Sequence, residues 1–132
     1  MGLAEKKIVD EVEAAATNSW KAEYKKHSGI DLDLTVDWSS FGDDFSKHKS
    51  MRMDAPNRIF KIVGRVLGQI CENPTGREAF QGKVQKVKFT NTDDKGDGTY
   101  SISNGELNVT LCFADGTLPT DRAIKDLIEA KL

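Results

Sequence analysis

Aspartates gather in two stretches of this chain, and closely spaced carboxylates can supply oxygen ligands to calcium. In IDLDLTVDW, from Asp31 onward, they stand at alternate positions, and in NTDDKGDG they lie among glycines. A calcium loop of the EF-hand type needs a glycine at its sixth position and a bidentate glutamate at its twelfth. Counted from Asp31, those positions hold Val36 and Gly42; in the second stretch Lys95 replaces a ligand and Ile102 replaces the glutamate. We therefore interpret the first stretch as the solvated face of a strand and the second as a loop, and expect no metal site.

Histidine and cysteine, the other residue types suited to catalysis, are few. His27 and His48 each lie among lysines, a setting typical of exposed histidines, while Cys71 and Cys112 carry no local nucleophile signature. We expect both cysteines to be free thiols. The chain also lacks a phosphate-binding loop, a dinucleotide fingerprint, a nucleophile elbow and a His-Glu-x-x-His motif. The sequence therefore predicts no catalytic residue, no metal ligand set and no cofactor.

A basic patch lies in residues 39–54, the least patterned part of the chain. It consists of Lys47, His48, Lys49 and Arg52, with two methionines between them. Loops on a rigid scaffold often carry function, so this patch is a candidate surface for binding another protein. The alternative is a solvated connection whose methionines pack loosely beneath it.

Three aromatic residues are candidates for a ligand pocket. Trp20, Trp38 and Tyr100 come from three different predicted elements. Ligand pockets are concave and rich in aromatic side chains. We therefore consider a small-molecule pocket between sheet and helices lined by these rings.

Three lysines suggest contact with single-stranded RNA. Lys83, Lys86 and Lys88 alternate outward on a predicted strand, where they could meet phosphates. No aromatic residue shares their phase, since Phe89 faces the core, and the net charge of −2 argues against broad electrostatic capture of nucleic acid. The sequence therefore gives no strong indication of nucleic-acid binding.

The scaffold that must position these residues is clearest in TYSISNGELNVTLCF, residues 99–113. Apolar residues alternate with polar ones on both sides of Asn104-Gly105, a pair that suits a type I′ hairpin turn. This turn would place Ile102 opposite Leu107. Two further strands are predicted at 30–38 and 84–90, the second with Phe89 inward.

Helical periodicity predicts three main helices. The first spans 3–28 and stops at Gly29, and the last begins after Thr120 as its cap. Between them, a central core helix ends at Asn73-Pro74, and a short helix capped by Thr75 follows.

Two glycines four residues apart interrupt the core helix. Gly64 and Gly68 each cost about 1 kcal/mol relative to alanine in a helix interior. Close packing of another element against this face of the helix is the expected compensation.

The order of these elements predicts an α+β fold: an antiparallel sheet of about four strands, the N-terminal strand plus a C-terminal meander, with three main helices packed on it. A length of 132 residues suits a single domain, 1–132. No apolar run approaches the ~20 residues that span a bilayer. The N-terminal residues lack the apolar segment of a secretory signal. This composition fits the cytoplasm, or the periplasm or exterior if a signal peptide has been removed.

These observations favour a non-enzymatic protein-binding or interaction module whose partner is another protein. The alternative is a protein with a small-molecule pocket, with enzymatic activity as a further option. The sequence contains none of the catalytic motifs named above, whereas its hydrophobic pattern and turn residues predict the helices and strands clearly. Binding is therefore the leading expectation.

Overall fold

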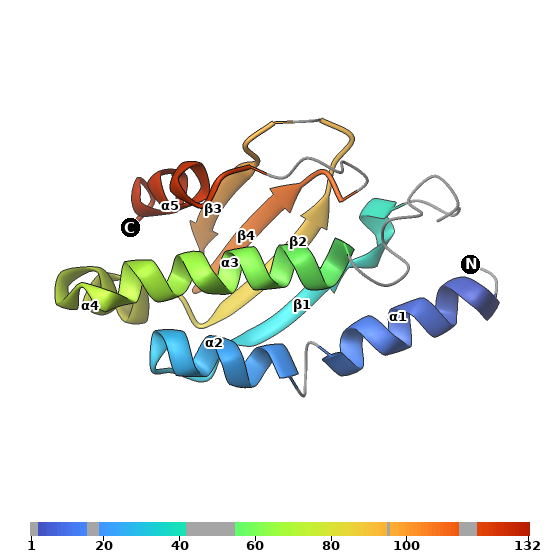
Figure 1. The fold of residues 1–132 in the computed structure, drawn as a ribbon, viewed down its shortest axis with the longest axis horizontal. Helices are drawn as coiled ribbons and strands as arrows, with labels where there is room; N and C mark the ends of the chain where they lie inside the picture. Colours follow the sequence, from blue (N-terminus) through green and yellow to red (C-terminus); the bar gives the residue numbers. More distant parts are fainter. Residues whose placement is uncertain (1–2, 16–18, 42–54, 95, 114–118) are drawn as a thin grey trace.

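The computed structural model describes residues 3–15, 19–41, 55–94, 96–113 and 119–132 (Figure 1). In this part of the chain, five α-helices, one 3-10 helix and a four-stranded sheet form a mixed α/β fold. The elements are α1 (Leu3–Ala15), α2 (Lys21–Ser28), β1 (Asp33–Asp37), η2 (Trp38–Phe41), α3 (Ala55–Glu72), α4 (Pro74–Lys83), β2 (Lys86–Asn91), β3 (Thr99–Ser103), β4 (Glu106–Leu111) and α5 (Asp121–Glu129). None of the described helices has the length and apolarity needed to cross a membrane.

The hairpin forms as predicted. β3 and β4 pair antiparallel, with Ile102 opposite Leu107 and Tyr100 opposite Val109. Asn104 and Gly105 connect them with φ of 52° and 77°, the left-handed values that a type I′ turn requires. The turn chemistry therefore fixes the register of this pair.

The sheet itself is mixed, so the expected purely antiparallel sheet is wrong. Its strand order is β1-β2-β4-β3, with β1 parallel to β2 and β2 parallel to β4. β1 and β2 run parallel because α3 and α4 carry the chain back to the same end of the sheet between them. β4 lies between β2 and β3, so the connection after β2 leads to the far edge instead of a neighbouring strand.

The described parts of the predicted first helix form two elements. α1 ends at Ala15 and α2 begins at Lys21, and residues 16–18 between them lie outside the described residues. α2 stops at Gly29 as expected: this glycine has a φ of 79°, and its N–H donates to the Lys25 carbonyl at 2.7 Å. The Trp38 indole donates to Glu13 of α1 at 2.9 Å.

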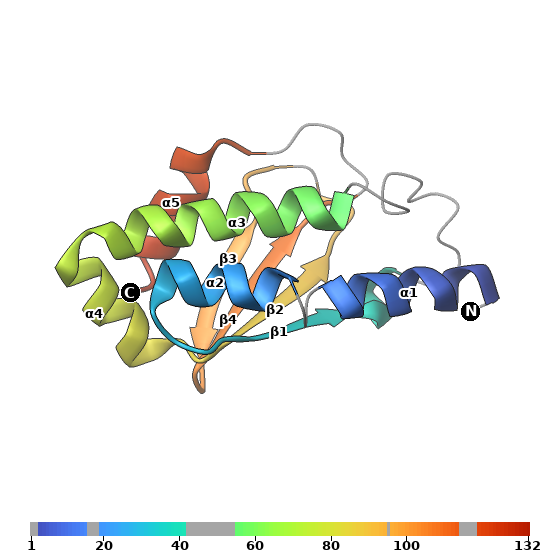
Figure 2. The same cartoon turned by 60° about the horizontal axis from the view of Figure 1, so that its bottom comes forward.

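Helices α2, α3 and α5 cover one face of the sheet, and no described helix covers the other (Figure 2). α3 is the central core helix that the sequence predicted, in contact with α2, α4 and α5. Its buried stripe consists of Ile59, Phe60, Val63, Val66, Leu67, Ile70 and Cys71. Phe60 meets the edge of Phe89 on β2, with ring centroids 4.6 Å apart. This layer of contacts joins helix to sheet.

α4 is capped by Asn73, so the expected Thr75 cap is wrong. The Asn73 side-chain oxygen accepts from the backbone N–H groups of Thr75 and Gly76 at 2.8 and 3.3 Å. Pro74 then occupies the first helical position, where its missing N–H costs nothing. α5, by contrast, is capped by Thr120 as predicted.

A carboxylate–guanidinium pair connects α3 to α5. Arg65 donates to both oxygens of Asp121, from Nε at 2.5 Å and from Nη2 at 2.8 Å. The hydrogen bond from Arg65 is the main reason that the pKa of Asp121 is lowered. The pair therefore stabilises the folded state while Asp121 is ionised.

We expect Asp121→Asn to lower the free energy of unfolding by about 1 kcal/mol at pH 7, the upper range for a well-oriented surface pair. Because folding lowers the pKa of Asp121, its contribution is complete above the ordinary aspartate pKa and disappears as pH falls through the folded value. The difference between variant and wild type should therefore be smaller at pH 2 than at pH 7. Urea unfolding at both pH values measures it.

Asp126→Asn is the matched control on the same helix. Asp126 lies 4.0 Å from Arg122, and both side chains are well exposed. We expect a change of no more than about 0.3 kcal/mol. Equal losses in the two variants, or an undiminished loss for Asp121→Asn at pH 2, would contradict the proposed contribution of the pair.

Candidate functional site

Two helices, α2 and α3, approach each other closely where α3 lacks side chains. Tyr24 of α2 is fully buried, and its hydroxyl donates to the Phe60 carbonyl of α3 at 2.7 Å. A Cβ atom at Gly64 would lie only 2.8 Å from the Tyr24 ring, and one at Gly68 only 2.7 Å from Nδ1 of His27. Close packing therefore explains both glycines, as the sequence suggested.

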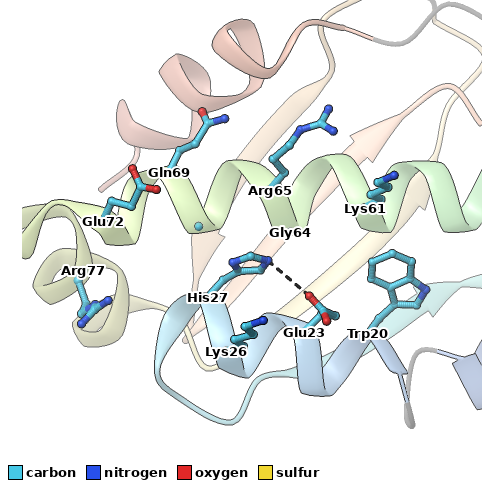
Figure 3. A pocket seen from close by; sticks show the side chains of 11 residues that line it. Trp20, Glu23, Lys26, His27, Lys61, Gly64, Arg65, Gln69, Glu72 and Arg77 are labelled. Atoms are coloured by element: carbon cyan, nitrogen blue, oxygen red, sulfur yellow. Dashed lines mark ion pairs between the residues drawn. The ribbon is translucent and has the colours of Figure 1, made fainter.

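A groove of about 590 Å³ opens along this junction (Figure 3). Its lining comes from three helices and one cap residue: Trp20, the N-cap of α2, then Glu23, Lys26 and His27 from α2, Lys61, Gly64, Arg65, Gly68, Gln69 and Glu72 from α3, and Arg77 from α4. Lys61 and Glu72 are eleven positions apart on α3, which corresponds to roughly 16 Å along the helix axis. The site is therefore elongated, with glycines along one wall.

The charge of the groove is opposite to that of the whole chain. Four lysine and arginine side chains face two glutamates, a formal charge of +2, whereas the chain carries −2. Arg65 is engaged by Asp121 outside the groove. In the described part of the protein, no carboxylate lies within ion-pairing distance of Lys26, Lys61 or Arg77. The groove therefore offers three cations that remain able to pair with an anion.

Polar and aromatic side chains complete the lining. Nε2 of His27 lies 3.7 Å from a carboxylate oxygen of Glu23, one helical turn earlier. Trp20 is half-buried at the end of the groove near Lys61 and packs against Phe60, with ring centroids 6.1 Å apart. The site thus combines an aromatic surface with positive charge.

Comparison with protein family models, curated proteins and solved structures finds no match to this chain. Geometry and chemistry therefore carry the functional argument. The groove is the strongest candidate because it brings cations from three helices to one aromatic-lined cavity.

The three aromatic residues proposed from the sequence do not come together. Trp20 lines the groove, but Trp38 follows β1 at one edge of the sheet and Tyr100 lies on β3 at the other. Three strand spacings, or about 14 Å, separate those edges. Trp38 packs on Phe41 with centroids 5.7 Å apart, and the buried Tyr100 donates its hydroxyl to a loop carbonyl. The structure therefore places these rings at separate positions, and a ligand-binding role for them stays a prediction.

The basic patch of Lys47, His48, Lys49 and Arg52 lies outside the described residues. Its role in binding stays a prediction. The described residues on either side of this segment are Phe41 of η2, whose buried ring meets Phe113 edge-on at 5.1 Å, and Ala55 at the start of α3.

The lysines considered for RNA binding are divided between two elements. Lys83 is the last residue of α4, whereas Lys86 and Lys88 lie on the sheet face without a helix. Lys86 lies in register between Asp33 and Glu106 on the neighbouring strands, so carboxylates flank it on both sides. None of the described strands places an aromatic residue on this face. Base stacking on the sheet therefore has no support.

Reactive groups elsewhere are sparse in the described residues. Cys71 and Cys112 are free and buried, and burial raises the pKa of the Cys71 thiol although nearby Arg77 opposes that rise. A raised thiol pKa disfavours the thiolate that a nucleophile or metal ligand needs. Nowhere in the described ranges do three histidine, cysteine or acidic side chains gather as a metal site would require.

Sequence reasoning missed Lys26, Lys61 and Arg77 as site residues. Part of a signal was present: Lys61 lies within one turn of Gly64, and a glycine in a helix interior indicates that another element packs closely against that face. Arg77 had no comparable signal, because α4 brings it to the groove through the fold.

We expect Gly64→Ala to destabilise the protein by about 1 kcal/mol. A methyl group would collide with the Tyr24 ring, whose hydroxyl is held on the Phe60 carbonyl and prevents an easy retreat. Overpacking costs about 1–3 kcal/mol, and the helix preference of alanine over glycine returns about 1 kcal/mol. Thermal and urea unfolding measure the net change.

Gly82→Ala provides the comparison within α4. No atom lies within 4 Å of a Cβ placed there, so alanine should leave stability unchanged or raise it by up to about 1 kcal/mol. If Gly64→Ala proved as stable as Gly82→Ala, close helix packing would not be the reason for Gly64.

Proposed function

We propose that this protein is a non-enzymatic binding module that takes a segment of another protein into the α2–α3 groove. The observation that carries this proposal is the set of three cations, Lys26, Lys61 and Arg77, without ion-pair partners in the described part of the chain, beside the ring of Trp20. Tryptophan and arginine, both present in this lining, are enriched at protein–protein interfaces and among the residues that contribute most to binding.

The lining residues favour binding over catalysis. His27 contacts Glu23 on its own helix, and none of the described residues that line the groove is a serine, threonine or cysteine that a base could activate. Catalysis by a hydroxyl or thiol nucleophile requires such a residue within hydrogen-bonding reach of a base. The cavity instead offers charge, an elongated shape and an apolar end.

A small-molecule ligand is the second candidate. The volume of about 590 Å³ falls within the range of about 300–1,000 Å³ typical of ligand pockets. The elongated form of the groove along α3 favours an extended chain over a compact metabolite.

The proposal predicts that peptides selected for binding will occupy this groove. Random twelve-residue peptides displayed on phage are selected against the full chain, and the enriched ones are added to ¹⁵N-labelled protein. We expect the amide resonances of Gly64 and Gly68 to shift, because both residues line the groove. Resonances on the uncovered sheet face, such as those of Ser101 and Asn108, serve as the internal control and should stay in place.

Either of two results would overturn the protein-binding function assigned to this groove: selected peptides that shift only residues elsewhere, or a selection that yields no binder. Shifts of Gly64 and Gly68 produced by a panel of small carboxylic acids and phosphates, but by no peptide, would favour the small-molecule alternative.

A further inference from the structure

We infer that the ligand of the α2–α3 groove is an extended acidic segment of about five residues with an aromatic side chain near one end. This inference rests on the proposed function and adds the chemistry of the ligand. It follows from the charge, the length and the distribution of residue types along the groove.

Charge gives the sign of the ligand. Lys26, Lys61 and Arg77 are exposed, and no described carboxylate pairs with them. The fourth cation, Arg65, already has a partner in Asp121, and Glu23 lies against His27. A ligand carboxylate would therefore meet cations that no internal ion pair has to release first, while a basic ligand would face net repulsion.

Length gives the form of the ligand. The wall from Lys61 to Glu72 extends roughly 16 Å, and an extended chain advances about 3.3 Å per residue. About five residues therefore fit between the two ends. Trp20 lies beside the Lys61 end, whereas Arg77 and Glu72 mark the other (Figure 3). An aromatic side chain of the ligand is therefore expected at the Trp20 end.

Residue type separates carboxylates from phosphates. Recognition of phosphorylated peptides relies on arginine clusters that bind bidentately. Of the two arginines lining this groove, Arg65 is committed to Asp121 in that bidentate geometry. Lysines supply most of the remaining positive charge, and a lysine ammonium is a point charge that pairs with a carboxylate without strict geometry. Glutamate and aspartate are therefore the expected anions.

Fluorescence anisotropy tests this inference with a fluorescein-labelled peptide of four glutamates and one phenylalanine, the phenylalanine lying at the end away from the label. We expect the full chain to bind it at least about tenfold more tightly than the same peptide with glutamines, which corresponds to about 1.4 kcal/mol. The difference should shrink in 0.5 M salt because the groove cations are exposed. Replacing phenylalanine by alanine should weaken binding several-fold.

Charge-reversed variants locate the binding. The double variant Lys26→Glu with Lys61→Glu should bind the glutamate peptide more than about tenfold less tightly, since attraction becomes repulsion at two lining positions. Lys7→Glu with Lys131→Glu changes the net charge equally at exposed positions outside the groove. The affinity of this control variant for the glutamate peptide should stay within about twofold of the wild-type affinity. Circular dichroism should show that both variants are folded.

Four results would overturn the inference: equal affinity for the glutamate and glutamine peptides, equal weakening in the two double variants, full binding by the Lys26→Glu and Lys61→Glu variant, or tenfold tighter binding when phosphoserines replace two glutamates. The last would assign the groove to phosphate groups. Selected peptides that shift Gly64 and Gly68 but contain no acidic residues would refute this inference alone and leave the proposed function standing.

Discussion

The contact of Tyr24 with the backbone of α3 is the constraint on which this half of the molecule depends. The tyrosine hydroxyl reaches the Phe60 carbonyl at 2.7 Å only because position 64 has no side chain. Burial raises the pKa of this hydroxyl well above its usual value, so the donor keeps its proton. An unsatisfied phenol at full burial would cost about 1–3 kcal/mol, and the hydrogen bond avoids that cost. The same contact sets the spacing of α2 and α3, and hence the width of the groove above it.

The sequence predicted those elements whose geometry is decided locally. Asn104-Gly105 dictates its turn whatever surrounds it, so the pairing of β3 with β4 and its register were both correct. The neighbour of β4 on its other side is not decided locally. Leu107 and Val109 point into the core whether or not β2 pairs with the other edge of β4, so alternation fits both strand orders. The two helices between β1 and β2 were the available sign of a parallel pair.

The candidate site was predictable only in part, and for a similar reason. Gly64 and Gly68 indicate that another element packs closely on α3, because glycine in a helix interior lowers stability. Trp20 was a candidate pocket residue because it is aromatic. Which element makes that approach cannot be read from α3. Lys26 and Arg77 reach the groove from two other helices, and no spacing within the sequence relates them to Lys61. Their convergence is a property of tertiary packing.

The net charge of the chain does not report the charge of the groove, because paired and unpaired lysines of α2 lie on different sides of that helix. On one side, Lys21 and Lys25 pair with Asp33 and Asp31 at 3.4 and 3.3 Å, beside edge strand β1. Those two aspartates therefore neutralise the charges of Lys21 and Lys25. Lys26 is adjacent in sequence to Lys25, but it lines the groove, where no described carboxylate pairs with it. A chain of net charge −2 can therefore present a positive surface, since screening over about 8 Å at physiological salt makes local charge decide what binds there.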